Sequence, residues 1–464
     1  MKQESYLPAG ALDRKAFTKM ACAIALPIAA QNLINTLVGS ADVFMLGYVS
    51  QTALSASSLA NQVQFILSCV YYGLVAGAGI MVAQYWGKHD VRTIERILGI
   101  ATRFSMMVSV IFFLPACFCP HLLMRIFTNE EPIIREGAVY LRYISFTYLL
   151  QGFTSMYLAV IRSKERVILP MVTYAVSLSA NILINAIFIF GLLGAPKLGL
   201  VGVAVGTLTA RIIETMICLI DSARSKDVKF RLRRLFEKGG VLTKDLLSLG
   251  SPAMINDLAW GTAFSMYSVI LGHLGSDAVA ANSVAAIARN LGTVLCFGFA
   301  NGTAIILGKA ISEKGIEVAK LYSKRMVRIT SIAGILGGGL VLMVRPLLLL
   351  FAGNLTPQAA SYLNTMLLIN AYYVWAQGVN TCWICGCFRA GGDTRWGMVC
   401  DILDMWCFSV PLGMFVAFVL KLPVLWVYFI LCLDEFVKIP FIIKHFRSFS
   451  WIRNITRNEE ELAP

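Results

Sequence analysis

The sequence predicts an all-α integral membrane protein of twelve transmembrane helices, arranged as two six-helix lobes with both termini in the cytoplasm. Three observations predict this fold: an apolar composition, basic residues on alternate connections, and an internal repeat. Of the 464 residues, 58% are hydrophobic and 14% are charged, and the mean hydropathy is +0.71. Soluble proteins carry about 25% charged residues, so this composition excludes a soluble fold. Nucleic-acid binding, which a net charge of +14 would otherwise suggest, needs basic residues clustered on a soluble face.

Twelve apolar stretches are each long enough to cross a bilayer, which takes about 20 helical residues. They lie near 16–45, 53–82, 97–119, 138–161, 167–193, 198–221, 246–271, 278–307, 326–351, 359–388, 396–420 and 423–444. The start of the chain contains no compact apolar segment with a cleavage site, so we expect no removable signal peptide.

The basic residues orient these spans. With the N-terminus placed inside, 31 of the 40 Lys and Arg residues fall on the inner side, 5 on the outer side and 4 within spans. Basic connections stay in the cytoplasm. We therefore expect a multi-pass protein of a bacterial cell membrane, inner or plasma, whose basic loops contact membrane lipids.

The two halves of the chain align when the sequence is shifted by 225 residues. Between 46 and 77, eight of 32 positions are identical, and the shift pairs Pro27 with Pro252 and Gly77 with Gly302. Because the shift spans six helices, equivalent helices run in the same direction, which makes the halves parallel repeats about a pseudo-two-fold axis along the membrane normal. We expect an N-terminal lobe (1–221), a basic cytoplasmic loop (222–245), a C-terminal lobe (246–445) and a cytoplasmic tail (446–464).

Five pieces of the sequence resemble the multidrug and toxic compound extrusion (MATE) transporters. They are residues 25–62, 181–214 and 251–263, the stretch FRAGGDTR (388–395), and the spacing of Asp401, Trp406 and Pro411. They occur in both halves in the family's order. The resemblance implies a two-lobed efflux transporter, or antiporter, whose central cavity opens to alternate sides of the membrane and is driven by H⁺ or Na⁺. Relatives in the wider superfamily flip lipid-linked sugars, so a lipid-linked precursor is an alternative substrate.

Asp42 is the candidate coupling residue, because an ionisable group within an apolar span is costly and usually functional. At about 100° per residue, Gln31, Asn35 and Asp42 share one face of the first span, and Pro27 on its edge allows a bend. The resembled family has an acid at the position of Asp42. The alternative is a carboxylate that caps the outer end of this span.

A second polar stripe lies on the fifth span, where Asn181 and Asn185 are one turn apart, with Thr207 at similar depth in the sixth. With Asp42 they form an oxygen set suited to Na⁺, or to hydrogen bonding with a protonated Asp42. Interhelical amide bonds are the structural alternative. The family often carries an acid where this chain has Asn185, so its Na⁺ site lacks one carboxylate here.

The residues of the predicted substrate cavity lie in the second half of the chain. Asp257 lies in the seventh span, after Pro252, the second expected hinge. It either pairs with Arg289 of the eighth span or attracts a cationic substrate or a proton. Trp260 and Phe264 share its face and can stack on a cationic aromatic compound. Asp401 and Asp404 share a face of the eleventh span and either pair with basic loops or line the cytoplasmic mouth.

The other patterns favour packing over chemistry. Cys382, Cys385 and Cys387 have no neighbouring His and make no zinc motif, and the run Gly337 to Gly339 predicts close helix contact. We expect no metal site other than the possible Na⁺, no cofactor, no catalytic residues and no nucleic-acid partner. The sequence predicts a monomeric exporter of amphiphilic, cationic small organic compounds. A membrane receptor or structural protein without transport is the alternative from a different class, but no connection is long enough for a sensing domain.

Overall fold

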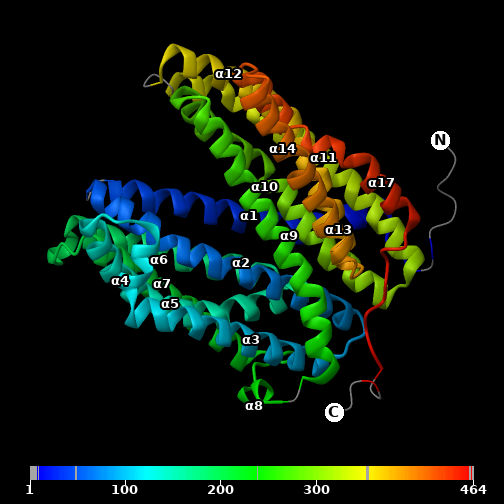
Figure 1. Ribbon diagram of the computed structural model, residues 1–464. Helices are drawn as coiled ribbons and strands as arrows, with labels where there is room; N and C mark the ends of the chain where they lie inside the picture. The colour runs from blue at the N-terminus through cyan, green and yellow to red at the C-terminus, as the bar shows by residue number, and fades with distance from the viewer. Residues whose placement is uncertain are drawn as a thin grey trace. The chain divides into compact units, whose positions relative to one another are not determined.

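The computed structural model describes residues 8, 10–47, 50–237, 239–351, 355–458 and 461, without the side chains of 36–44, 47, 51, 193, 350 and 351. All secondary structure in this described part is helical (Figure 1). Nine of its helices are long and apolar enough to cross a membrane. Two further helices, α9 (Gly240–His273) and α12 (Pro357–Thr381), are 34 and 25 residues long.

The chain forms two compact units, and neither unit is one continuous segment of the sequence. Unit 1 contains residues 1–30 and 252–456, and unit 2 contains residues 31–251 and 457–464. Two continuous helices therefore change unit along their length: α1 (Arg14–Gly47) after Ala30, and α9 before Pro252. Each of these helices contains one proline, Pro27 or Pro252, near the change.

Unit 2 is built from α2 to α7 together with parts of α1 and α9. Its helices are α2 (Gln51–Gly87), α3 (Val91–Phe118), α4 (Pro120–Phe127), α5 (Glu131–Ser163), α6 (Ile168–Phe190) and α7 (Leu200–Arg224), with short α8 (Leu232–Leu235) in the connection to α9. Ser50 and Asp90 cap α2 and α3 by accepting backbone N–H bonds from Ala53 and Thr93. Gly191, with φ of +71°, ends α6.

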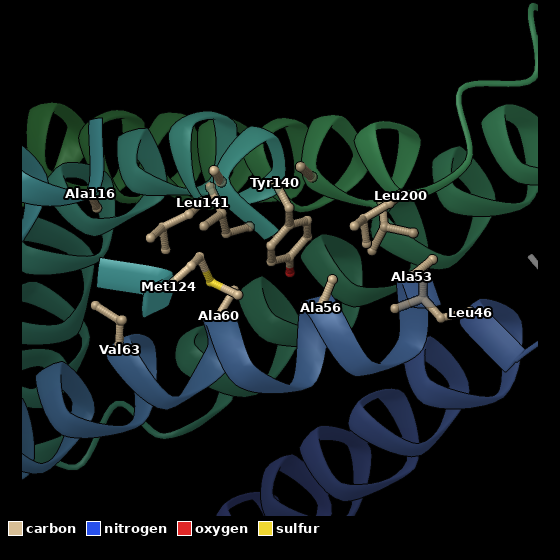
Figure 2. Close-up of a cluster of buried hydrophobic side chains, with 14 of the residues drawn as sticks. Leu46, Ala53, Ala56, Ala60, Val63, Ala116, Met124, Tyr140, Leu141 and Leu200 are labelled. Carbon is tan, nitrogen blue, oxygen red and sulfur yellow. The ribbon is translucent and has the colours of Figure 1, made fainter. Parts of the chain in front are cut away.

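The core of unit 2 lies between α2 and α5, with contributions from α3, α4 and α7. Small residues of α2, Ala56 and Ala60, face Tyr140 and Leu141 of α5 (Figure 2). Alanine leaves room for the larger side chains of α5, so these two helices pack closely.

Unit 1 contains the remaining helices, several of them interrupted. They are α10 (Ser276–Glu313), α11 (Ile316–Phe351), α12, α13 (Thr394–Ile402), α14 (Val410–Met414), α15 (Val424–Leu431), α16 (Asp434–Val437) and α17 (Ile439–Ser448). Three π-helical segments occur among them: η3 (Cys382–Phe388), η4 (Leu403–Ser409) and η5 (Phe415–Val419). Such wider turns are rare in proteins, and those that do occur often lie at functional sites.

The same close helix contact occurs once in each unit. In unit 2, a Cβ on Gly77 of α2 would lie 2.7 Å from the carbonyl oxygen of Leu246 and 3.1 Å from Cα of Gly250 in α9. In unit 1, a Cβ on Gly302 of α10 would contact Ala25 of α1 at 3.4 Å. The shift of 225 residues relates Gly77 to Gly302 and Ala25 to Gly250. The first halves of α1 and α9 therefore pack on equivalent helices through equivalent small residues.

Candidate functional site

The polar stripe of the fifth predicted span is a hydrogen-bonded chain between α6 and α7. Nδ2 of Asn181 donates to Oγ1 of Thr207 at 3.1 Å, and Nδ2 of Asn185 donates to Oδ1 of Asn181 at 3.3 Å. Ser177, one turn earlier, donates to the carbonyl of Ala210 at 3.0 Å. Asn185 is fully buried. The structure therefore brings the three predicted residues of α6 and α7 together, and the amide of Asn181 links the two helices through Thr207.

The predicted residues of α1 differ in their surroundings. Gln31 is 5% exposed, and its Oε1 accepts no hydrogen bond from the part of the chain that the structure describes. Asn35, on the next turn, is exposed. The side chain of Asp42 lies outside the described residues, so its predicted approach to Asn181, Asn185 and Thr207 stays a prediction.

Asp257 forms an ion pair with Arg389, which lies in the stretch FRAGGDTR (388–395). Oδ1 of Asp257 accepts from a guanidinium nitrogen of Arg389 at 2.7 Å, and the same nitrogen donates to Oδ1 of Asn256 at 3.2 Å. Arg389 follows the π-helix η3, and its side chain is 15% exposed against 30% for Asp257. The cation beside Asp257 is therefore Arg389, and the expected alternative of an Asp257–Arg289 pair is not the arrangement observed.

Arg289 of α10 instead lies over aromatic rings. Its guanidinium carbon is 4.8 Å from the ring centre of Phe264 and 5.7 Å from that of Tyr373. Phe264 also contacts Trp260, with ring centres 4.5 Å apart. The three predicted cavity residues Trp260, Phe264 and Arg289 thus form one cation–aromatic cluster.

Lys438, between α16 and α17, is the centre of a buried acidic network. Its ammonium lies 3.0 Å from a carboxylate oxygen of Asp401, 3.0 Å from one of Glu435 and 3.8 Å from one of Asp404. Its side chain is 3% exposed. The structure thus buries Lys438 against acids of the eleventh and twelfth predicted spans.

Two asparagine side chains bond the ion-pair groups of unit 1, and one of them, Asn256, connects the two groups. Nδ2 of Asn256 donates to Oδ2 of Asp401 at 2.7 Å, so Asn256 links the Asp257–Arg389 pair to the Lys438 group. Asn380 of α12 donates to Oε2 of Glu435 at 2.8 Å.

Neither Arg389 nor Lys438 was predicted as a site residue. The available signal was the run Asp434-Glu435-x-x-Lys438 inside the last apolar stretch, where three charged residues in five require partners from other helices.

The geometry favours charge binding over catalysis. Among the described residues, no group of three or more His, Cys, Asp and Glu side chains is arranged to hold a metal ion. In unit 2, the side-chain oxygens of Asn181 and Thr207 already accept hydrogen bonds, from Asn185 and Asn181 respectively. Both units therefore offer buried polar groups within long apolar helices, which is typical of ion and substrate pathways.

The sequence of this chain is similar to a known protein family and to individual transporters. The sequence profile of the family MatE matches residues 27–187 and 252–415, which is more than half of the chain. The uncharacterized transporter YisQ of Bacillus subtilis is 22% identical over 440 residues, covering 92% of this chain and 93% of that protein. The probable multidrug resistance protein NorM of Thermotoga maritima is 24% identical over 396 residues, covering 84% and 83%.

A solved structure shows the same fold. The crystal structure of a MATE mutant superposes with a TM-score of 0.85 at 16% identity, covering 93% of this chain and 97% of that one. The family match covers both halves, and the fold agrees along nearly the whole chain. This multi-pass membrane protein therefore belongs to the MATE family of transporters.

Proposed function

We propose that the protein is a secondary active antiporter that exports amphiphilic, cationic organic compounds in exchange for H⁺ or Na⁺. Twelve spans with cytoplasmic termini form two lobes, which open a cavity to alternate sides of a bacterial cell membrane. Relatives described as multidrug resistance proteins support export of organic compounds.

The division of α1 and α9 between the units is the observation that carries this proposal. Each helix is continuous, changes unit within four residues of a proline, and packs its first half on the small residues of an equivalent helix. Proline removes a backbone hydrogen bond and permits bending. Bends at Pro27 and Pro252 would let both units move while the helices stay intact, as alternating access requires.

Coupling is assigned to Asp42 with Gln31, Asn35, Asn181, Asn185 and Thr207. The chain Asn185–Asn181–Thr207 supports this role, because it holds amide and hydroxyl groups at fixed positions inside an apolar bundle. A neutral, protonated Asp42 can join such a chain as a donor, whereas an ionised Asp42 needs water or Na⁺. Binding and release of the ion would thereby change the helix bend at Pro27.

Substrate binding is assigned to Asp257, Trp260, Phe264 and Arg289. The partial exposure of Asp257 and the adjoining Trp260–Phe264 ring pair support a site for an aromatic cation. A cationic substrate would compete with Arg389 for Asp257. Because Arg389 compensates the charge of Asp257 when no substrate is bound, the empty site costs less free energy than a site with an unpaired carboxylate.

Transport by the purified protein in proteoliposomes tests the proposal. With a fluorescent organic cation as substrate, we expect accumulation driven by a pH or a Na⁺ gradient and none when both are collapsed. Varying the two gradients separately identifies the ion. Accumulation that survives the loss of both gradients would rule out secondary coupling, and transport of an anionic lipid-linked substrate alone would favour the flippase.

Two substitutions test the coupling site within this assay. Asp42→Asn is expected to lower gradient-driven uptake at least tenfold, and Asn181→Ala is expected to lower it severalfold. Ser179→Ala is the matched control for Asn181→Ala, because Ser179 is exposed on α6 and, within the described part of the chain, donates its hydroxyl to the carbonyl of Ala175. Full gradient-driven transport by folded Asp42→Asn would contradict the assignment.

A further inference from the structure

Unit 1 buries four carboxyl groups around a single lysine. Asp401 of α13, Asp404 of η4, and Asp434 and Glu435 of α16 are each at most 6% exposed, and Lys438 is 3% exposed. The Asp257–Arg389 pair is electrically balanced and adds no cation to this group. If all four acids were ionised, the cluster would carry three uncompensated negative charges in an apolar environment.

Three of the four acids have hydrogen-bond donors. Asp401 accepts from Lys438 and Asn256, and Glu435 lies 3.0 Å from Lys438 and accepts from Asn380 at 2.8 Å.

Asp434 accepts from the hydroxyls of Tyr267 and Tyr373 at 3.1 and 3.4 Å, and from the backbone N–H of Glu435 at 2.7 Å. These donors stabilise the ionised form of each of the three acids.

Asp404 is the exception. Neither of its carboxyl oxygens accepts a hydrogen bond from any residue that the structure describes, and its side chain is 4% exposed. Lys438 is 3.8 Å away but is held at 3.0 Å by both Asp401 and Glu435. A buried carboxylate without donors and with three acidic neighbours is the group on which ionisation is least favourable.

The ligand that fits this position is a proton and not a metal ion. The ammonium of Lys438 already occupies the point where the carboxylates of Asp401 and Glu435 converge. The described residues contain no group of three acidic, His or Cys side chains arranged around a common metal position. A proton needs only one oxygen, and it removes a charge without adding an ion that must be solvated.

We propose that Asp404 is a proton-binding site of the C-terminal unit, separate from Asp42. The proton is transferred from hydronium in bulk water, whose O–H bond breaks to leave water, and forms an O–H bond to one Asp404 oxygen, while Lys438 stays charged between Asp401 and Glu435. When Asp404 releases the proton to water, its new negative charge attracts Lys438. Lys438 lies 3.8 Å from Asp404 in the observed arrangement, so a move toward Asp404 lengthens its 3.0 Å contact with Asp401 or Glu435.

Hydrogen bonds connect this exchange of partners to Asp257, the proposed substrate-binding residue. Asp401 is joined through Asn256 to Arg389, and Arg389 holds Asp257. Loss of Lys438 from Asp401 would strengthen the attraction of Asp401 for Arg389 and weaken the hold on Asp257. This relay rests on the proposed role of Asp257 in transport, whereas proton binding at Asp404 does not.

Asp404 lies in the π-helical segment η4, next to α13, which carries Asp401. π-helical turns are rare in proteins and are found frequently at functional sites. Among the described residues, the titratable and charged groups around the cluster on its neighbouring elements include Tyr267 of α9, Arg289 of α10, Tyr373 of α12, Cys385 of η3, Arg389, Cys400 of α13 and Cys432.

Infrared spectroscopy of the full-length protein in lipid nanodiscs tests the proposal at equilibrium, without transport. A protonated carboxyl has a carbonyl stretch separate from that of a carboxylate. At pH 7 we expect Asp404→Asn to lower the protonated-carboxyl band by the area of one group. Glu214→Gln is the matched control, because Glu214 is equally buried but paired with Arg211 at 2.7 Å, and its removal should leave the band unchanged.

Two further variants keep the test decisive. Asp42→Asn should retain the Asp404 contribution, which separates this site from the proposed coupling residue. Lys438→Met removes the cation and should increase the band by at least one further carboxyl, a change that disrupted packing does not produce. The proposal is overturned if folded Asp404→Asn keeps the wild-type band. If Asp404→Asn does not fold, an unchanged band in Lys438→Met overturns it.

Discussion

Several polar and charged side chains of unit 1 are paired with residues far away in the sequence. Asp257 and Arg389 are separated by 132 positions, and Asn256 and Asp401 by 145. Local spacing does reveal the pairs Arg211–Glu214 and Glu435–Lys438, three residues apart and in contact at 2.7 and 3.0 Å. Long-range partners depend on which helices pack together.

The Asp257–Arg389 pair gives a prediction at the residue scale. Removing one partner leaves the other charge without compensation, so Arg389→Gln and Asp257→Asn should each lower the free energy of unfolding by about 1–3 kcal/mol. The lower part of this range is expected, because the side chain of Asp257 is 30% exposed. Thermal unfolding in detergent measures the change.

The double variant Arg389→Gln with Asp257→Asn is its control. Because both charges are then absent, we expect its stability to exceed that of the less stable single variant. Strictly additive losses would mean that the two side chains do not interact in solution.

At the scale of elements, the three consecutive glycines of α11 differ in how closely neighbouring helices approach them. A Cβ on Gly337 would overlap the carbonyl oxygen of Gly292 in α10, and one on Gly338 would overlap that of Ala371 in α12. Gly339 has nothing within 4 Å of that position. The predicted close contact is therefore made by two of the three residues, one toward each neighbouring helix.

This run supplies its own matched variants. Gly337→Ala and Gly338→Ala must push backbone atoms apart, so each should lower the free energy of unfolding by about 1–3 kcal/mol. Gly339→Ala should be neutral or stabilise by up to about 1 kcal/mol, because alanine favours the helix. Melting temperatures of the three purified variants distinguish the positions, and equal effects would contradict the observed packing.

The π-helical segments were not predicted, and the reason is physical. Apolar composition and length identify a span, but a wider turn changes neither. The segment η4 contains Asp404 and η3 ends immediately before Arg389, so the unpredicted turns accompany the unpredicted site residues.

At the scale of the whole molecule, the internal repeat predicted from 225-residue spacing has a counterpart in each unit. The contacts Gly77–Gly250 and Gly302–Ala25 are equivalent under that shift. The division of the chain at residues 30 and 251 also gives each unit the first part of a helix whose remainder belongs to the other.

The predicted topology of twelve spans and cytoplasmic termini can be measured by labelling. In a background without the exposed Cys119 and Cys407, a membrane-impermeant maleimide should label Lys197→Cys in intact cells. It should label Lys226→Cys and Asn454→Cys only after the membrane is opened, because these positions lie on the basic side. All three replaced residues are exposed. Labelling of Asn454→Cys but not of Lys226→Cys in intact cells would require an odd number of spans between these two positions and would contradict the predicted topology.

The sequence by itself determined the class of the protein, the presence of long apolar helices, the repeat and the polar stripe of α6. These features follow from composition and from spacing along one helix, which a linear pattern records. Only the tertiary structure decided that Arg389 holds Asp257, that Lys438 is buried among four acids, and that Asp404 has no donor among the described residues. Each depends on side chains from different helices meeting in a medium of low polarity, where a charge must have a partner or a proton.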